Sequence, residues 1–286
     1  MTIVAVFDGV EGMDTLTITR YHIPVAGVKQ KTICHFSDVH LTAYDDLCTP
    51  EELEHALQQT QSWIDTRRYF AEAHGCPTGE AQMVDSRVQY ARLLALANTA
   101  DAAVLTGDIM NEVTPADIRA TEAGLSTLQV PFVAVCGNHE QAVNIPDGML
   151  LSVMKQPVSV VDLGDLQLIG VDNSTRVITP EQLAEVERLL ADGKPTVIAL
   201  HVPMLNAENY GTVYGCGEYF RMHDYDGCPE ENYRLRDLVA AEGSPVVAVL
   251  SGHLHFPCVS AFDNGVKQYG VSQGITGNVH LYTIGE

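Results

Sequence analysis

The chain has 286 residues, of which 46% are apolar, so it is long enough to bury a sizeable core in one α/β domain or two smaller ones. Its 16 basic and 37 acidic side chains give a formal net charge of −21. Such a surface repels polyanions, which argues against extended binding along DNA or RNA and against attachment to anionic membranes. No stretch approaches the roughly 20 apolar residues that a membrane span needs.

The sequence predicts a cytoplasmic protein with reduced thiols. Its first residues include a short apolar run that lacks the basic start of a secretory signal. The seven cysteines are odd in number, widely spaced and without a Cys-x-x-Cys pair, which does not favour a disulfide framework. A Cys48–Cys76 or a Cys216–Cys228 bridge remains open as an alternative.

Apolar strand-like runs alternate with helical stretches in the first half of the chain, and the second half is rich in strands. Strands are predicted at 3–7, 15–22, 31–37, 102–106, 131–136, 158–162, 166–171, 196–200, 246–250, 257–262, 266–271 and 279–284. Helices are predicted at 50–74, 81–98, 114–128, 179–191 and 233–242. Three of these helices begin with a Thr-Pro pair followed by acidic residues, which is typical of a capped helix start. This order predicts an α/β sandwich whose sheets are covered by helices.

No repeat or Pro/Gly-rich linker marks a domain boundary, so residues 1–286 are predicted to form a single domain. Two segments are interpreted as insertions. Residues 43–98 hold two predicted helices and the only tryptophan, Trp63. Residues 203–232 are rich in Gly, Tyr and Asn with little periodicity, which indicates a lid or binding loop. Because this segment follows His201 directly, we expect it to cover the site that His201 belongs to.

Polar side chains that bind metals or handle phosphate recur where predicted strands end. Taken singly these segments are weak signals, since a lone histidine or a Gly-Asp pair is usually a strand end or a turn. Together they supply seven oxygen and nitrogen ligands, which is enough for two neighbouring metal ions. The segments are Asp38-Val-His40, Gly107-Asp108, Gly137-Asn138-His139-Glu140, His201-Val-Pro and Gly252-His253-Leu-His255.

The residue types indicate which ions such a site would take. Two ions held close together need a shared anionic ligand, and a carboxylate such as Asp108 can present an oxygen to both. Mixed His, Asp and Asn ligation suits divalent transition metals (Mn, Fe or Zn) better than Mg or Ca. Gly107, Gly137 and Gly252 each precede a ligand, where a missing Cβ permits a tight turn.

In this order the five segments resemble the pattern of the calcineurin-like metallophosphoesterase superfamily, over residues 38 to 255. The resemblance implies a four-layer α-β-β-α sandwich of two mixed β-sheets flanked by helices. It also implies a catalytic role for His139, facing the substrate, and for Asp108, bridging two ions. By the same resemblance one ion is bound by Asp38, His40 and His255, and the other by Asn138, His201 and His253.

The expected reaction is attack of a metal-bridging hydroxide on phosphorus, with His139 donating a proton to the leaving oxygen. Glu140 or Asp172 is a candidate for orienting the His139 imidazole. The favoured function is hydrolysis of a small phosphomonoester or phosphodiester, with a nucleotide-like substrate stacking on aromatic residues of the 203–232 segment. Asn111 and Glu112 depart from the Ser/Thr protein phosphatase branch of the family, so that activity is disfavoured.

The alternative is a non-catalytic metal-binding scaffold that uses the same fold for protein interaction. The complete ligand set and His139 favour the enzyme. Other histidines lie outside the pattern: His35 is expected in the core, whereas His223 either touches substrate or is exposed to solvent. The sequence does not predict an oligomeric state.

Overall fold

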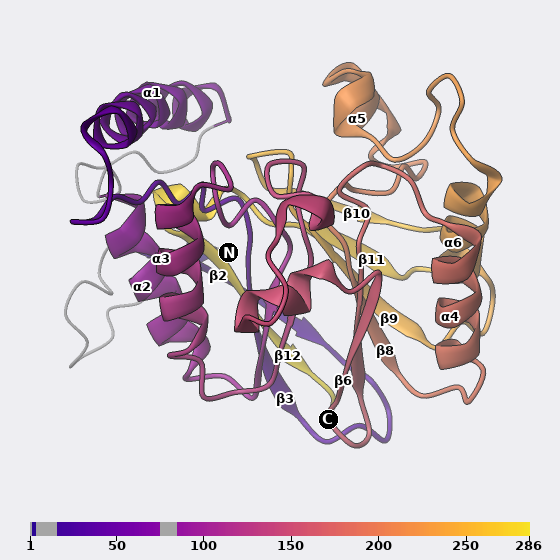
Figure 1. Ribbon diagram of the computed structural model, residues 1–286. Helices are drawn as coiled ribbons and strands as arrows, with labels where there is room; N and C mark the ends of the chain where they lie inside the picture. The colour runs from indigo at the N-terminus through magenta and orange to yellow at the C-terminus, as the bar shows by residue number, and fades with distance from the viewer. Residues whose placement is uncertain (1, 4–15, 75–84) are drawn as a thin grey trace.

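The computed structural model describes residues 2–3, 16–74 and 85–286, with two six-stranded sheets packed face to face (Figure 1). The first sheet has the order β1-β2-β12-β3-β4-β5 and the second β10-β11-β9-β8-β7-β6. The first sheet comprises β1 (Thr2–Ile3), β2 (Thr17–Ile23), β3 (Lys31–Phe36), β4 (Ala102–Leu105), β5 (Phe132–Ala134) and β12 (Asn278–Ile284). The second comprises β6 (Val158–Asp162), β7 (Gln167–Val171), β8 (Thr196–Ala199), β9 (Val246–Ser251), β10 (Cys258–Ala261) and β11 (Lys267–Gly270).

Both sheets are mixed. In the first sheet β3, β4 and β5 are parallel, while β12 runs antiparallel to β3 and parallel to β2. In the second sheet β7, β8, β9 and β11 are parallel, and the edge strands β6 and β10 are antiparallel to their neighbours. The predicted strands each overlap an observed one, although most of the strand expected at 3–7 lies outside the described residues.

Five longer helices accompany the sheets: α1 (Pro50–His74), α2 (Ser86–Ala97), α3 (Pro115–Leu125), α4 (Pro180–Leu190) and α6 (Glu230–Ala240). Figure 1 shows α2 and α3 on the outer face of the first sheet, and α4 and α6 on the outer face of the second. The predicted four-layer α-β-β-α sandwich is therefore confirmed. Within the described residues, no helix combines the length and apolarity that crossing a membrane requires.

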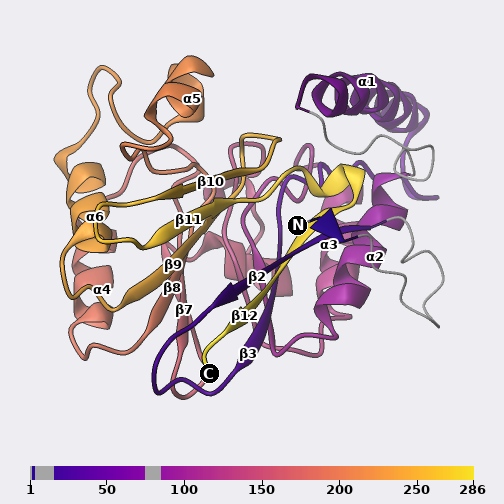
Figure 2. The ribbon, with the colours of Figure 1, turned by 180° about the vertical axis from the view of Figure 1, so that it is seen from behind.

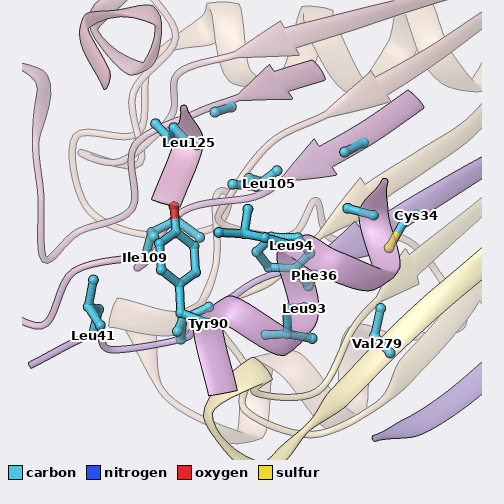
Figure 3. Packing of buried hydrophobic residues seen from close by; sticks show 14 of the residues in the cluster. Cys34, Phe36, Leu41, Tyr90, Leu93, Leu94, Leu105, Ile109, Leu125 and Val279 are labelled. Atoms are coloured by element: carbon cyan, nitrogen blue, oxygen red, sulfur yellow. The ribbon is translucent and has the colours of Figure 1, made fainter. Parts of the chain in front are cut away.

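The inner strands β3, β4, β7, β8 and β9 bury both of their faces, which explains why they read as continuous apolar runs rather than alternating ones. In β3, Cys34 and Phe36 point toward the helices, whereas Ile33 points toward the second sheet. Figure 3 shows Phe36 packed with Leu93 and Leu94 of α2. The layer between the sheets is filled by small and branched residues, among them Val104, Val133, Val197, Ala199 and Leu250.

The 203–232 segment is not the structureless loop that its composition predicts. It contains a short helix, α5 (Tyr210–Gly215), and a 3₁₀ turn at Glu218–Phe220. Figures 1 and 2 show α1 and α5 standing beyond the same end of the sheets, one on each side. One helix from each segment interpreted as an insertion therefore flanks this edge of the sandwich.

The three Thr-Pro helix starts are capped as the sequence predicts. Thr49 and Glu52 exchange hydrogen bonds at the start of α1, and the Thr114 hydroxyl accepts one from the Asp117 amide at the start of α3. Thr179 forms a complete capping box with Gln182 at the start of α4. Each cap satisfies amide hydrogens that the helix itself leaves without partners.

Replacing Thr179 by Ala removes the acceptor of the Gln182 amide hydrogen, so we expect a loss of about 1 kcal/mol in the free energy of unfolding. Urea denaturation measures this loss. Thr179→Ser keeps the hydroxyl and serves as the control, with a midpoint close to the parent's. Equal midpoints for Thr179→Ala and Thr179→Ser would contradict the role of this cap.

Candidate metal centre

The structure brings the five sequence segments together at one edge of the sandwich, beyond the carboxyl ends of β3, β4, β5, β8 and β9. The first three strands are parallel neighbours in one sheet, and the last two are parallel neighbours in the other. Carboxyl ends of parallel strands meet at a common edge, which is where α/β proteins commonly place their sites. Side chains from both sheets therefore converge on one place.

The backbone of these loops is unusual at the candidate ligands themselves. Asp38, His40, Asp108, His253 and His255 all have positive φ, between 45° and 71°. These five are among the eight non-glycine residues with positive φ in the described part of the chain. Such residues are uncommon, and their concentration at one place is typical of a functional site.

Glycine is required where the loops touch one another. A Cβ on Gly252 would lie 1.9 Å from the Ser37 hydroxyl oxygen and 2.6 Å from a carboxylate oxygen of Asp38. Gly107 has φ +87°, and a Cβ there would meet the Gly137 amide nitrogen at 2.5 Å. The absence of side chains at these positions lets the loops from both sheets approach closely enough to share ligands.

The candidate ligand atoms form two groups with one common member. Asp38, His40, Asp108 and His255 make the first, and Asp108, His201 and His253 make the second, with the atoms of each group within 4.8 Å of one another. In the first group His255 Nε2 lies 3.0 Å from His40 Nε2 and 3.2 Å from Asp38 Oδ1.

In the second group His201 Nε2 lies 3.4 Å from Asp108 Oδ2. The same nitrogen lies 3.1 Å from Asn138 Oδ1, which brings Asn138 to this group as well. The seven side chains that the sequence singles out as ligands are thus gathered, and Asp108 stands between the two sets.

The protonation states fit metal binding. Burial and the nearby His255 keep the pKa of His40 well below its usual range, and burial with His201 lowers the pKa of His253 to about 4. Although burial opposes it, His255 lowers the pKa of Asp38 to about 2. Neutral imidazoles and ionised carboxylates are the forms that ligate metals. His40 Nδ1 is also buried with no hydrogen-bond partner among the described residues.

Asp108, the ligand expected to bridge the two ions, forms an ion pair with His201. Burial raises the pKa of Asp108, but His201, followed by His40 and His139, outweighs burial and holds that pKa well below its usual range. Burial lowers the pKa of His201, but Asp108 outweighs it and raises that pKa to about 10. In the chain alone a proton on His201 balances the shared carboxylate, and a divalent cation would displace that proton.

Backbone carbonyls fix the imidazole rings of the second group. His201 Nδ1 lies 2.6 Å from the Thr106 carbonyl oxygen, and His253 Nε2 lies 3.1 Å from the carbonyl oxygen of Tyr219. The nitrogen that faces the carbonyl donates its hydrogen there, so in the neutral ring the other nitrogen keeps its lone pair for a metal ion. Such outer contacts set the tautomer and orientation of metal-binding histidines.

His139 lies beside both groups. Its amide nitrogen donates to Asp108 Oδ1 at 2.9 Å, and its ring is edge-on to His40 with centroids 4.7 Å apart. His139 Nδ1 lies 2.7 Å from the carbonyl oxygen of Asn111. The idea that Glu140 or Asp172 orients this imidazole is therefore wrong, because the Asn111 carbonyl occupies that position.

Glu140 has a different partner set. Its buried carboxylate accepts hydrogen bonds from the amide nitrogens of Asp108, Met110 and Gly137, at 2.7 to 2.9 Å. Burial and the nearby Asp108 raise its pKa to about 7. Glu140 thus joins the loop after β4 to the loop after β5, which no sequence pattern alone revealed.

Aromatic side chains from the two flanking segments form the walls of the site. Trp63 of α1 stacks on His40 with ring centroids 3.8 Å apart, and its Nε1 donates to Asn111 Oδ1. On the opposite side Tyr219 and Phe220 lie against His253, with centroids 5.4 and 5.1 Å away. Nothing in the sequence spacing of Trp63 connects it to the motifs, so the sequence alone does not predict this contact.

Two histidines outside the motifs, His35 and His223, have structural contacts. His35 is buried, as expected, and its Nε2 lies 2.8 Å from the Thr106 hydroxyl oxygen. His223 neither faces the site nor reaches solvent: it is buried, between the Leu205 amide and the Asn232 carbonyl. Cys48, Cys216 and Cys228 are free thiols, so the Cys216–Cys228 bridge does not form, and Cys76 of the other alternative lies outside the described residues.

Comparisons with known proteins agree with this geometry. The family model described as calcineurin-like phosphoesterase matches residues 31–257. No curated protein sequence matches the chain. A dimetal phosphatase from Danio rerio has a similar structure, with a TM-score of 0.57 and 11% identity over 90% of this chain and 93% of that one.

A second similar structure is the purple acid phosphatase PPD1 from yellow lupin (Lupinus luteus) seeds. Its TM-score is 0.51 with 13% identity, over 90% of this chain and 46% of that one. At these identities the structural likeness supports the fold, while the family match extends over most of the chain and over every candidate ligand. The chain therefore belongs to the calcineurin-like phosphoesterase family and is a metal-dependent phosphoester hydrolase with a dinuclear site of Asp and His ligands.

Proposed function

We propose that this enzyme hydrolyses a small phosphomonoester or phosphodiester with a nucleotide-like organic part. Asp38, His40 and His255 would hold one ion, and Asn138, His201 and His253 the other. Asp108 would contact both ions and His139 would face the substrate. The observation that carries the proposal is that Asp108 belongs to both ligand groups while its Oδ1 accepts the His139 amide hydrogen at 2.9 Å.

When bound, two divalent transition-metal ions (Mn, Fe or Zn) would activate water as a nucleophile and neutralise charge on the phosphoryl group. The chain itself orients the participants. Asp38 and Asp108 supply the negative charge that holds cations in a buried place, and the Thr106 and Tyr219 carbonyls keep His201 and His253 aimed at the centre.

In this proposal, His139 transfers a proton to the leaving oxygen. Because its Nδ1 hydrogen is directed to the Asn111 carbonyl, Nε2 is the nitrogen that would face the substrate. A protonated Nε2 can donate to the leaving oxygen as the bond to phosphorus breaks. No covalent intermediate with the protein is required.

The surroundings support a small aromatic substrate. Trp63 on one side and Tyr219 with Phe220 on the other offer ring faces on which a base can stack. The Tyr219 side chain is about half exposed and is therefore accessible to a ligand. A formal charge of −21 disfavours a long polyanion, so we propose a free nucleotide-like ester rather than a nucleic acid.

Removing metals with a chelator should abolish hydrolysis of p-nitrophenyl phosphate and bis(p-nitrophenyl) phosphate. Adding back Mn, Fe or Zn should restore turnover, because these ions bind imidazole ligands better than Mg does. The faster of the two esters separates monoesterase from diesterase. Full metal binding with no turnover of either ester would instead favour the scaffold alternative.

Asp108→Asn should reduce the amount of bound metal, because the shared ligand loses its charge. Its loss of turnover should exceed the loss of about 10–100-fold that follows when a residue contacting only a metal ligand is changed.

His139→Ala should lower turnover by about 10²–10⁴-fold and leave both ions bound. Metal content by mass spectrometry and initial rates distinguish the two. His22→Ala, on an exposed strand residue, is the control. Loss of metal from His139→Ala would overturn its assignment as a non-ligand.

A further inference from the structure

Within residues 50–65 of helix α1, one face carries a row of polar contacts to the body of the protein. His55, Gln59 and Trp63 lie four residues apart, so they share one face of the helix over successive turns. Their partners are two adjacent residues, Asn111 and Glu112. His55 pairs with Glu112 at 2.7 Å, and Gln59 and Trp63 both form hydrogen bonds with the side chain of Asn111. Among residues 50–65 only Ala56 is buried.

Asn111 is held at every polar group. Its amide nitrogen donates to the Leu41 carbonyl at 3.0 Å, its side-chain oxygen accepts from Trp63 Nε1, and its side-chain nitrogen donates to Gln59 at 3.3 Å. Its own carbonyl accepts the Nδ1 hydrogen of His139 at 2.7 Å. Asn111 thus links α1 to His139 through hydrogen bonds on both sides.

Trp63 also touches the centre directly. Its ring lies on His40 with an interplanar angle of 21°, and its centroid is 6.1 Å from that of His139. The indole therefore bonds Asn111 through Nε1 and flanks the rings of His40 and His139. Figure 1 places α1 beyond the edge of the sheets, so these contacts join it to the metal centre.

We propose that Trp63 is a positioning residue for His139, acting through Asn111, so that docking of α1 sets how well the site protonates poor leaving groups. This inference rests on the proposed role of His139 as proton donor. Donation by His139 matters most when the leaving oxygen is basic and least when it leaves readily as an anion. The signature of lost positioning is therefore a rate loss that grows with leaving-group basicity.

The test compares phenyl phosphate, whose leaving group is basic, with p-nitrophenyl phosphate, or the matching diesters if these react faster. Trp63→Phe keeps an aromatic ring beside His40 but has no Nε1 hydrogen. We expect Trp63→Phe to lower kcat/KM about tenfold for the phenyl ester, as expected for one lost hydrogen bond, and by about twofold or less for the nitrophenyl ester. Gln61→Ala, on an exposed position of the same helix, is the matched control.

A double variant tests the route. If Trp63 acts through His139, then Trp63→Phe adds no further loss on the phenyl ester in a His139→Ala background. Asn111→Ala should show the same selectivity as Trp63→Phe, with the content of both metals unchanged. Additive losses, or equal losses on both esters, would overturn the positioning role and indicate a general structural effect.

The experiment separates this inference from the function on which it rests. If His139→Ala itself shows no dependence on the leaving group, the proton-donor role of His139 fails and the inference fails with it. If His139→Ala discriminates between the esters but Trp63→Phe does not, only the inference is overturned. Metal analysis of each variant shows whether a loss arises instead through His40.

Discussion

The buried carboxylate of Glu140 joins the loops that follow β4 and β5, because it accepts amide hydrogens from Asp108, Met110 and Gly137. Three amide dipoles directed at one carboxylate stabilise it where burial would otherwise disfavour its charge. Asp108 reaches both ligand groups because this interaction holds its loop against the neighbouring one. Asn111 follows three residues later, and His139 sits in the turn that Glu140 closes.

The arrangement of the sheets explains why two ions can be surrounded here. A single sheet would present its carboxyl ends along one line, whereas two sheets packed face to face present them from two sides. The first sheet contributes Asp38, His40, Asp108 and Asn138, and the second contributes His201, His253 and His255. The apolar layer between the sheets, from Ile33 to Leu250, holds these two sides at a constant separation.

Much of this could be predicted from the sequence, because the signals are local. Apolar runs marked the strands, Thr-Pro pairs marked the starts of α1, α3 and α4, and the motif residues converge at the strand ends. What escaped prediction depends on contacts between distant segments. The contact of Trp63 with Asn111 joins residues 48 positions apart. The orientation of His139 depends on a backbone carbonyl, and because every residue has one, the sequence does not indicate which carbonyl is used.

The structure of the 203–232 segment also escaped prediction from the sequence. Its composition indicated a loop, yet Tyr210 and Tyr214 stack on each other along α5, and His223 is buried by hydrogen bonds to backbone groups. Glycine and asparagine obscured the short helix because both are weak helix formers. The expectation that this segment contacts the site holds for Tyr219 and Phe220, which lie against His253.

The positive φ of five candidate ligands has a consequence for how this protein tolerates change. The left-handed backbone conformation disfavours residues with a Cβ, at a cost of about 1 kcal/mol or more for each residue. Five candidate ligands adopt it: Asp38, His40, Asp108, His253 and His255. Glycine at any of these positions would relieve that strain and at the same time remove a ligand. Selection for stability alone would therefore favour glycine at these positions and yield an inactive protein. The ligands are retained only under selection for activity.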